Sequence, residues 1–251
     1  MPSLESNKTP SWPKQILAWI EAHPHLVTAL FALAPLGFML RDLAYDWLTA
    51  NPIQELTFRT GKVGLVLLVG SLACSPLNAI SGLRFALKIR RDLGLFGFLY
   101  ISLHLLIFTA LDLGLDVALI VSATSQKLFV LAGMASFALL IPLAITSTKG
   151  WQRRLGKRWK PLHKLVYLAL PIAALHYVWL VKADIRTPLA YAAIIGLLLL
   201  ARVPAVRGWM SSLRRRVETG LRGPAAGKQK QNPFPRYPPA SPGDISEKNI
   251  L

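Results

Sequence analysis

Long apolar segments of membrane-spanning length dominate this chain. Six of them are apparent, at about residues 26–44, 63–80, 94–112, 128–146, 163–182 and 189–204. A helix needs ~20 predominantly apolar residues to cross the hydrocarbon core of a bilayer. In that environment every backbone polar group must be hydrogen-bonded within the protein, which favours helices. The sequence therefore predicts an all-α integral membrane protein, a bundle of six transmembrane helices.

The composition also favours a membrane protein over a soluble one. Of the 251 residues, 53% are hydrophobic and only 16% are charged, whereas soluble domains have roughly 25% charged residues. A net charge of +17 would suit a nucleic-acid partner, but the basic residues lie in short connections and in the C-terminal tail. We therefore expect no nucleic acid. The only cysteine, Cys74, excludes an intramolecular disulfide and a cysteine-bound cluster.

The charged residues predict the orientation of the helices. Lys and Arg gather after the second, fourth and sixth apolar segments, in residues 84–91, 149–164 and 207–216. The alternate connections hold six of the twelve acids, namely Asp42, Asp46, Glu55, Asp112, Asp116 and Asp184. Because basic connections stay in the cytoplasm, both termini are predicted to be cytoplasmic.

Three regions are expected along the chain. Residues 1–25 form a cytoplasmic N-terminal segment, and residues 26–205 form the transmembrane domain. Residues 206–251 are basic and rich in proline, a composition that cannot bury a core and predicts a disordered cytoplasmic tail. The basic start of this tail either contacts anionic membrane lipid or is simply solvated and secures the topology.

Two histidines lie deep inside apolar segments, His104 in FGFLYISLHLLIFTAL and His176 in VYLALPIAALHYVWLV. An ionisable or metal-binding side chain at that depth is costly and marks a candidate functional site. In the predicted topology the third and fifth helices both run outward from the cytoplasm. His104 follows Arg91 by 13 residues and His176 follows His163 by 13, a rise of ~20 Å in each helix. We therefore expect His104 and His176 at one level.

Two imidazoles at one level are suited to a haem with two axial histidine ligands. Neutral imidazole binds iron through one nitrogen, while a carbonyl or hydroxyl orients the other. Zinc is a weaker candidate, because no acidic or thiol ligand accompanies the histidines. For each histidine taken alone, the alternative is a side chain that only hydrogen-bonds between helices.

His163 differs from the other two histidines in its helical phase. Thirteen residues place His163 and His176 ~140° apart around an ideal helix. Both face the same neighbours only if the helix is distorted, for which Pro171 is a possible cause. His163 is therefore either an interfacial residue or a ligand at a second position nearer the cytoplasm. Arg91, at matching height, is the residue to test as its partner.

The segment from Thr146 to Lys182, TSTKGWQRRLGKRWKPLHKLVYLALPIAALHYVWLVK, closely resembles the MsrQ family, formerly YedZ. The similarity extends to RRDLGL before the third helix, to Leu103 and His104, and to TGK at residues 60–62. It covers about residues 26–205. Members of this family are haem-binding membrane subunits of the bacterial periplasmic protein-methionine-sulfoxide reductase system.

The resemblance implies a ferric-reductase-like domain in the bacterial inner membrane that binds b-type haem, in one or two copies. The family's haem-associated histidines match His104, His163 and His176. Electrons would pass from the quinone pool, or from a cytosolic flavin reductase, to the periplasmic molybdenum-containing subunit MsrP. That partner reduces methionine sulfoxide in oxidised proteins, so this chain would be the electron-transfer subunit. An FMN is also implied, although no motif places it.

Two other functions are compatible with parts of the sequence. A stand-alone ferric or b561-type reductase would share the haem chemistry but deliver electrons to a small molecule. A transporter or membrane scaffold would use the histidines only for hydrogen bonds. Transporters usually carry ionisable residues or broken helices at mid-membrane, whereas the acids of this chain lie in its connections.

Overall fold

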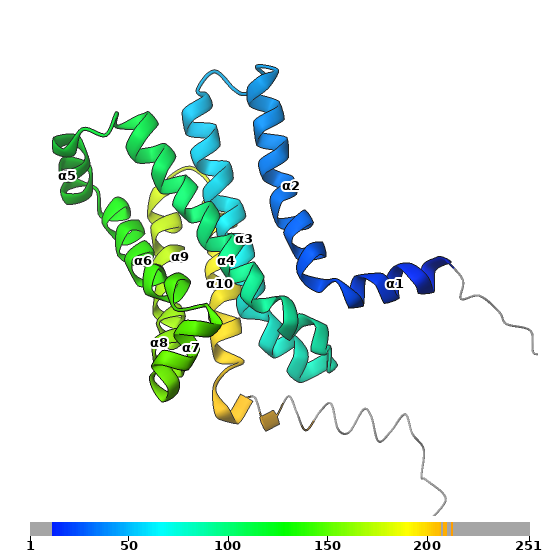
Figure 1. The fold of residues 1–251 in the computed structure, drawn as a ribbon. Coiled ribbons are helices and arrows are strands. Elements are labelled where there is room, and N and C mark those ends of the chain that lie inside the picture. The colour runs from blue at the N-terminus through cyan, green and yellow to red at the C-terminus, as the bar shows by residue number, and fades with distance from the viewer. Residues whose placement is uncertain (1–11, 207, 210–211, 213–251) are drawn as a thin grey trace, which may run out of the picture. The chain divides into compact units, whose positions relative to one another are not determined.

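The structure, a computed structural model, describes residues 12–206, 208–209 and 212. All regular structure in this part of the chain is helical, which confirms the all-α prediction. Residues 1–11 of the predicted N-terminal segment and most of the predicted tail lie outside the described residues. Within 12–22, the segment predicted to be polar and cytoplasmic contains a helix, α1 (Trp12–Ala22) (Figure 1).

Five stretches are long and apolar enough to cross a membrane. They are α2 (Pro24–Ala44), α3 (Pro52–Ser81), α4 (Arg84–Leu106) with its π-helical continuation (Ile107–Asp112), α6 (Leu128–Ile145), and the segment Lys149–Leu180 that ends in α9 (Val166–Leu180). The sixth predicted span is α10 (Arg186–Leu200), whose 15 residues rise ~22 Å. The chain is therefore a multi-pass membrane protein, while the count of six spans and the cytoplasmic termini stay predictions.

Two segments predicted as basic connections are themselves helical. Helix α4 begins at Arg84, so residues 84–91 form its first turns, and Gly82 and Leu83 alone connect it to α3. Gly82 has a φ of 73°, a left-handed conformation that glycine adopts without steric cost. The other basic segment forms α7 (Lys149–Leu155) and α8 (Trp159–Leu162). Helices of membrane proteins continue past the apolar core, so hydropathy alone underestimated their length.

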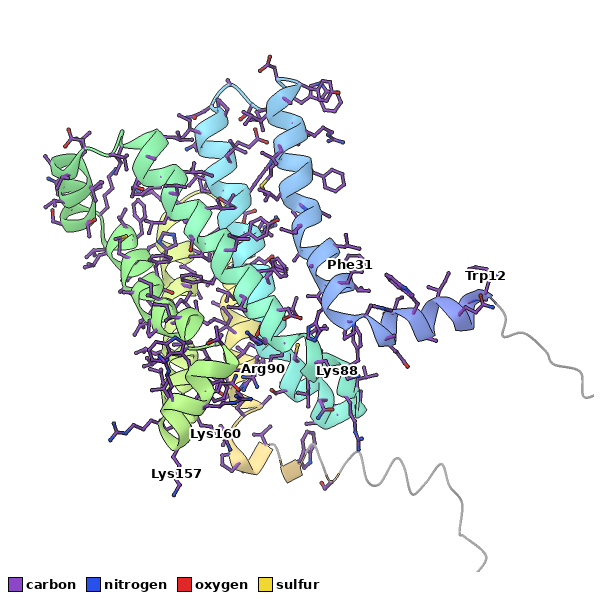
Figure 2. The ribbon with its side chains drawn as sticks, in the orientation of Figure 1. Trp12, Phe31, Lys88, Arg90, Lys157 and Lys160 are labelled. Atoms are coloured by element: carbon purple, nitrogen blue, oxygen red, sulfur yellow. The ribbon has the colours of Figure 1, made fainter. Side chains whose placement is uncertain are left out.

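Charge separates the two ends of the bundle. Figure 2 shows Lys88, Arg90, Lys157 and Lys160 at one end, here called the basic end. The opposite end, here called the acidic end, contains the connections 45–51, 113–116 and 181–185. A short helix that the sequence did not suggest, α5 (Val117–Gln126), precedes α6 at the acidic end (Figure 1).

The bundle is built around two tightly packed helix pairs, α3 with α4 and α6 with α9. Helix α2 packs on α4, and α10 packs on α9. Their shared core consists mainly of leucine and alanine: Leu65, Leu68, Leu72, Leu140, Leu143, Ala169, Leu170, Ala174 and Ile195. One hydrogen bond supports the outer contact of α2, since Tyr100 of α4 donates to Ala32 O of α2 (2.8 Å). Another lies within the α6–α9 pair, where Ser136 of α6 donates to Ala169 O of α9 (2.9 Å).

Two glycines allow the close approach of α3 and α4. A Cβ on Gly97 would lie 2.8 Å from Cγ and 3.1 Å from the backbone nitrogen of Leu68. A Cβ on Gly64 would lie 3.2 Å from the carbonyl oxygen of Gly97. Small residues at such positions let helix backbones pack closely in membranes, where van der Waals contact is a major source of helix association.

We predict that Gly97→Ala destabilises the bundle, because the added methyl group must displace backbone as well as side-chain atoms. Overpacking of this kind costs about 1–3 kcal/mol, measurable as a lower thermal unfolding temperature in detergent. Gly37→Ala is the control, since a Cβ there meets nothing within 4 Å. Equal stability of Gly97→Ala and wild type would contradict the close packing of α3 on α4.

Candidate functional site

The two membrane-embedded histidines meet between the two helix pairs of the bundle. His104 extends from α4 and His176 from α9, and their ring centroids lie 6.1 Å apart with the ring planes at 83°. The ring planes are therefore nearly perpendicular, and the rings do not stack. The sequence predicted that these residues share a level on parallel helices, and the structure brings them to one site.

Each histidine is oriented by a backbone carbonyl of the neighbouring helix. Nδ1 of His104 lies 2.8 Å from Thr57 O of α3, and Nδ1 of His176 lies 2.6 Å from Phe129 O of α6. A carbonyl oxygen can only accept a hydrogen bond, so Nδ1 must be the donor in both rings. In a neutral imidazole this leaves the lone pair on Nε2, which is the nitrogen free to bind a metal.

A glycine one helical turn beyond each carbonyl makes room for the imidazole. A Cβ on Gly61 would lie 2.9 Å from Nδ1 of His104, and a Cβ on Gly133 would lie 2.9 Å from Nδ1 of His176. Real Cβ atoms essentially never approach so closely. Any side chain at either position would therefore displace the ring from its carbonyl partner.

The two halves of the site repeat at an interval of 72 residues. Thr57, Gly61 and His104 in the α3–α4 pair correspond to Phe129, Gly133 and His176 in the α6–α9 pair. The same interval relates Gly64, which closely approaches Gly97, to Ser136, which hydrogen-bonds Ala169. The helix pairs thus present their histidines through the same local construction.

A cavity of about 470 Å³ adjoins the histidine pair and is formed by α3, α4, α6 and α9. This volume lies in the range of small-molecule and cofactor sites. Its lining is mostly apolar, with residues such as Leu65, Leu68, Phe108, Phe137 and Leu140. The exposed polar residues of the lining, called the rim here, come from elements near the acidic end: Asn51, Gln54, Lys62, Asp112 and Lys127.

His163 lies at a separate position near the basic end. Its Nε2 is 3.1 Å from the Thr146 hydroxyl, and its ring packs on Trp159 with centroids 4.1 Å apart. The Thr146 hydroxyl donates its proton to Pro142 O (2.6 Å), so it accepts from Nε2 of His163. The nitrogen that is free in the other two histidines is therefore engaged in His163.

The structure does not bring Arg91 to His163. The Arg91 side chain is exposed on α4, and within residues 12–206 it makes no hydrogen bond with His163, whose Nε2 contacts Thr146 instead. Its neighbour Arg90 lies within electrostatic range of His163 and donates to the Ser75 hydroxyl (3.1 Å). The helical phase explains the difference, because consecutive residues point ~100° apart.

Sequence reasoning found the histidines but missed the groups that orient them. Thr57 and Phe129 contribute backbone carbonyls, which carry no residue-type signal. The glycines do leave a signal in the sequence, because Gly61 precedes His104 by 43 residues and Gly133 precedes His176 by the same 43 residues. Outside this pair, no group of three or more His, Cys, Asp or Glu side chains able to hold a metal occurs in the part of the chain that the structure describes.

Comparison with known proteins agrees with this architecture. Residues 60–174 match the family described as the ferric reductase like transmembrane component. That stretch contains most of α3, all of α4 and α6, and ends two residues before His176.

Several similar proteins carry the name protein-methionine-sulfoxide reductase heme-binding subunit MsrQ. The one from Rhodospirillum rubrum is 48% identical over 162 residues, which cover 64% of this chain and 78% of the relative. The one from Caulobacter vibrioides is 42% identical over 175 residues, with 69% and 83% covered. The one from Xanthomonas axonopodis pv. citri is 41% identical over 178 residues, with 70% and 82% covered. With this identity across most of both sequences, the chain belongs to the MsrQ family.

Proposed function

We propose that this protein is a membrane electron-transfer subunit that binds a b-type haem between His104 and His176. The observation that carries the proposal is the matched pair of imidazoles, each held by a backbone carbonyl at Nδ1 and each left with a free Nε2. The names of the MsrQ relatives support it, since they describe heme-binding subunits.

The dimensions of the site fit this cofactor. His104 and His176 would hold the iron between them through their free Nε2 atoms, and imidazole nitrogens bind first-row metals at about 2 Å. A separation of 6.1 Å between the ring centroids would leave room for one metal ion between the two imidazoles. No third His, Cys, Asp or Glu joins them in the part of the chain that the structure describes, and the apolar lining would suit the body of a macrocycle.

The haem supplies one-electron redox chemistry when bound, and the protein sets its environment. The carbonyls of Thr57 and Phe129 fix the tautomer and the direction of each ring, and they raise the basicity of the coordinating nitrogen. More basic ligands favour the ferric state and lower the reduction potential. The apolar lining and the tight α3–α4 contact limit access of water to the site.

We infer that this subunit works in the bacterial inner membrane and passes electrons to MsrP, the periplasmic molybdenum-containing subunit. Methionine sulfoxide reduction would take place on that partner, with the quinone pool or a cytosolic flavin reductase as the donor. The position of the cavity toward the acidic end, which the charge pattern predicts to be periplasmic, supports delivery on that side. An FMN stays an expectation from the resemblance, without assigned residues.

A second haem on His163 also stays a prediction of the resemblance. In this structure Nε2 of His163 donates to Thr146, and Arg91 does not approach it. Ligation by His163 would require that the Thr146 contact be broken or that Nδ1 be used. The described geometry therefore supports one haem position, between His104 and His176.

We predict that purified full-length protein shows a reducible b-type absorption spectrum. His104→Ala and His176→Ala should each weaken or abolish that spectrum, because one of the two histidines that would hold the iron is lost. His163→Ala should preserve that spectrum, and its haem-to-protein ratio reports whether a second haem exists. A folded, colourless wild-type protein would overturn the proposed function.

We also predict that Gly61→Ala and Gly133→Ala lower haem occupancy while both histidines remain. The added methyl group would lie 2.9 Å from Nδ1, so the ring must leave its carbonyl partner. Loss of such an outer hydrogen bond typically costs about 10–100-fold in metal affinity or activity. Gly196→Ala is the matched control, because it lies in a helix with nothing within 4 Å of its Cβ. Equal haem content in all three variants would contradict the role of the glycines.

The physiological route is tested by stopped-flow reduction and reoxidation of the haem-loaded protein. We expect quinol, or a flavin reductase with NADH, to reduce it, and MsrP with methionine sulfoxide to reoxidise it. A ferric chelate serves as the competing acceptor. Reoxidation by the chelate but not by MsrP would favour the alternative function, a stand-alone ferric reductase. The match to the ferric reductase like transmembrane component is compatible with that alternative.

A further inference from the structure

Two lysines belong to the rim of the cavity, one from each helix pair. Lys62 lies in α3 and directly follows Gly61, while Lys127 immediately precedes α6, two residues before Phe129. Each lysine is therefore close in sequence to a group that orients one of the histidines. Both side chains are exposed.

Neither lysine has an acidic partner among residues 12–206. The ion pairs at this end of the bundle use arginines instead, because Asp42 pairs with Arg41 (2.7 Å) and Arg59 (2.6 Å), and Glu55 pairs with Arg59. The acids closest to the start of α3 are thus already neutralised. Asp112 is the only acid in the lining of the cavity, and it makes no described ion pair with either lysine.

The depth of Lys62 makes its positive charge informative. Helix α3 has 30 residues, or ~45 Å, whereas the hydrocarbon core is ~30 Å thick. Lys62 lies ten residues after the first residue of α3, ~15 Å along its axis, and therefore inside the core if α3 is centred in it. A lysine at such a depth is costly unless it reaches the interface or pairs with an anion, and it marks a functional position.

The cavity beside these lysines has room for a ligand with an apolar body, and the lysines add two positive charges at its edge. That combination matches haem, an apolar macrocycle whose two propionate carboxylates lie on one side. We propose that Lys62 and Lys127 bind the two propionates, so that the propionate edge of the haem faces the acidic end of the bundle. This inference rests on the proposed function, since it assigns further residues to the same haem.

The assignment has an electrostatic consequence for the cofactor. A lysine that pairs with a propionate places positive charge near the iron, which disfavours the ferric state and raises the reduction potential. The carbonyl contacts of the histidines act in the opposite direction. The potential of the bound haem would therefore be set by the balance between the two.

The test compares haem with its dimethyl ester, in which the propionates carry no charge. Full-length protein produced without haem is titrated in detergent with each compound, and the ratio of the two affinities is measured for wild type and for Lys62→Met/Lys127→Met. Comparison of ratios cancels the intrinsic solubility difference between the compounds. Because charge-assisted hydrogen bonds are strong, we expect the variant to reduce the ratio by about tenfold or more.

Two controls separate a propionate contact from a structural role. Lys182→Met removes a lysine of the 181–185 connection, outside the cavity lining, and should leave the ratio unchanged. Lys62→Arg keeps the charge and should retain most of the preference for the free acid. The reduction potential of the haem-loaded double variant should also fall, where a tenfold change in the reduction equilibrium corresponds to about 59 mV.

The outcomes are distinguishable. In the double variant, the affinity ratio and the reduction potential could both stay unchanged while both compounds bind between the histidines. This result would overturn the lysine assignment and leave the haem site intact. It is the result expected if these lysines pair with lipid phosphate instead. An equal loss of affinity for haem and for the ester would indicate that the lysines have a structural role, and it would also overturn the lysine assignment. Failure of wild type to bind either compound would overturn the proposed function itself.

Discussion

Two hydrogen bonds from imidazole to backbone carbonyl, His104 to Thr57 O and His176 to Phe129 O, determine the geometry of this site. Each bond joins the two helices of one pair, so it depends on the close packing within that pair. Each also requires a glycine one turn further along the partner helix. The helix pairing, the glycines and the histidine tautomers are therefore one connected arrangement, and a change in any of them alters which nitrogen faces the cavity.

The charged side chains at the two ends of the bundle play different parts. At the acidic end Asp42 joins α2 to α3 through its ion pair with Arg59, which leaves the rim lysines available for an anionic ligand. Toward the basic end, Arg202 follows α10 and donates to the Tyr167 hydroxyl of α9 (2.7 Å) and to Leu72 O of α3 (2.6 Å). These two hydrogen bonds join helices from both pairs, while the buried Nε of Arg202 has no hydrogen-bond partner in the described part of the chain.

His163 illustrates how helical phase limits inference from height alone. Arg91 and His163 are predicted to lie at the same height on two parallel helices. Height along the helix axis alone therefore suggests that the two residues are neighbours. In three dimensions the Arg91 side chain is exposed, while Arg90 lies near His163. The hydrogen bonds of His163 and of the Trp159 indole to Thr146 fasten the helical segment before α9 to the end of α6.

The sequence by itself determined the all-α membrane fold and the two central histidines, because hydropathy and the constant rise of a helix act locally along the chain. It underestimated the length of α3 and α4, since a helix continues where its residues become polar. Only the tertiary structure decided which helices pair, that backbone oxygens of Thr57 and Phe129 hold the imidazoles, and that Gly61 and Gly133 make room for them. Every residue has the same backbone carbonyl acceptor, so the sequence does not reveal which carbonyl a histidine will use. Packing between segments 47 residues apart decides this choice.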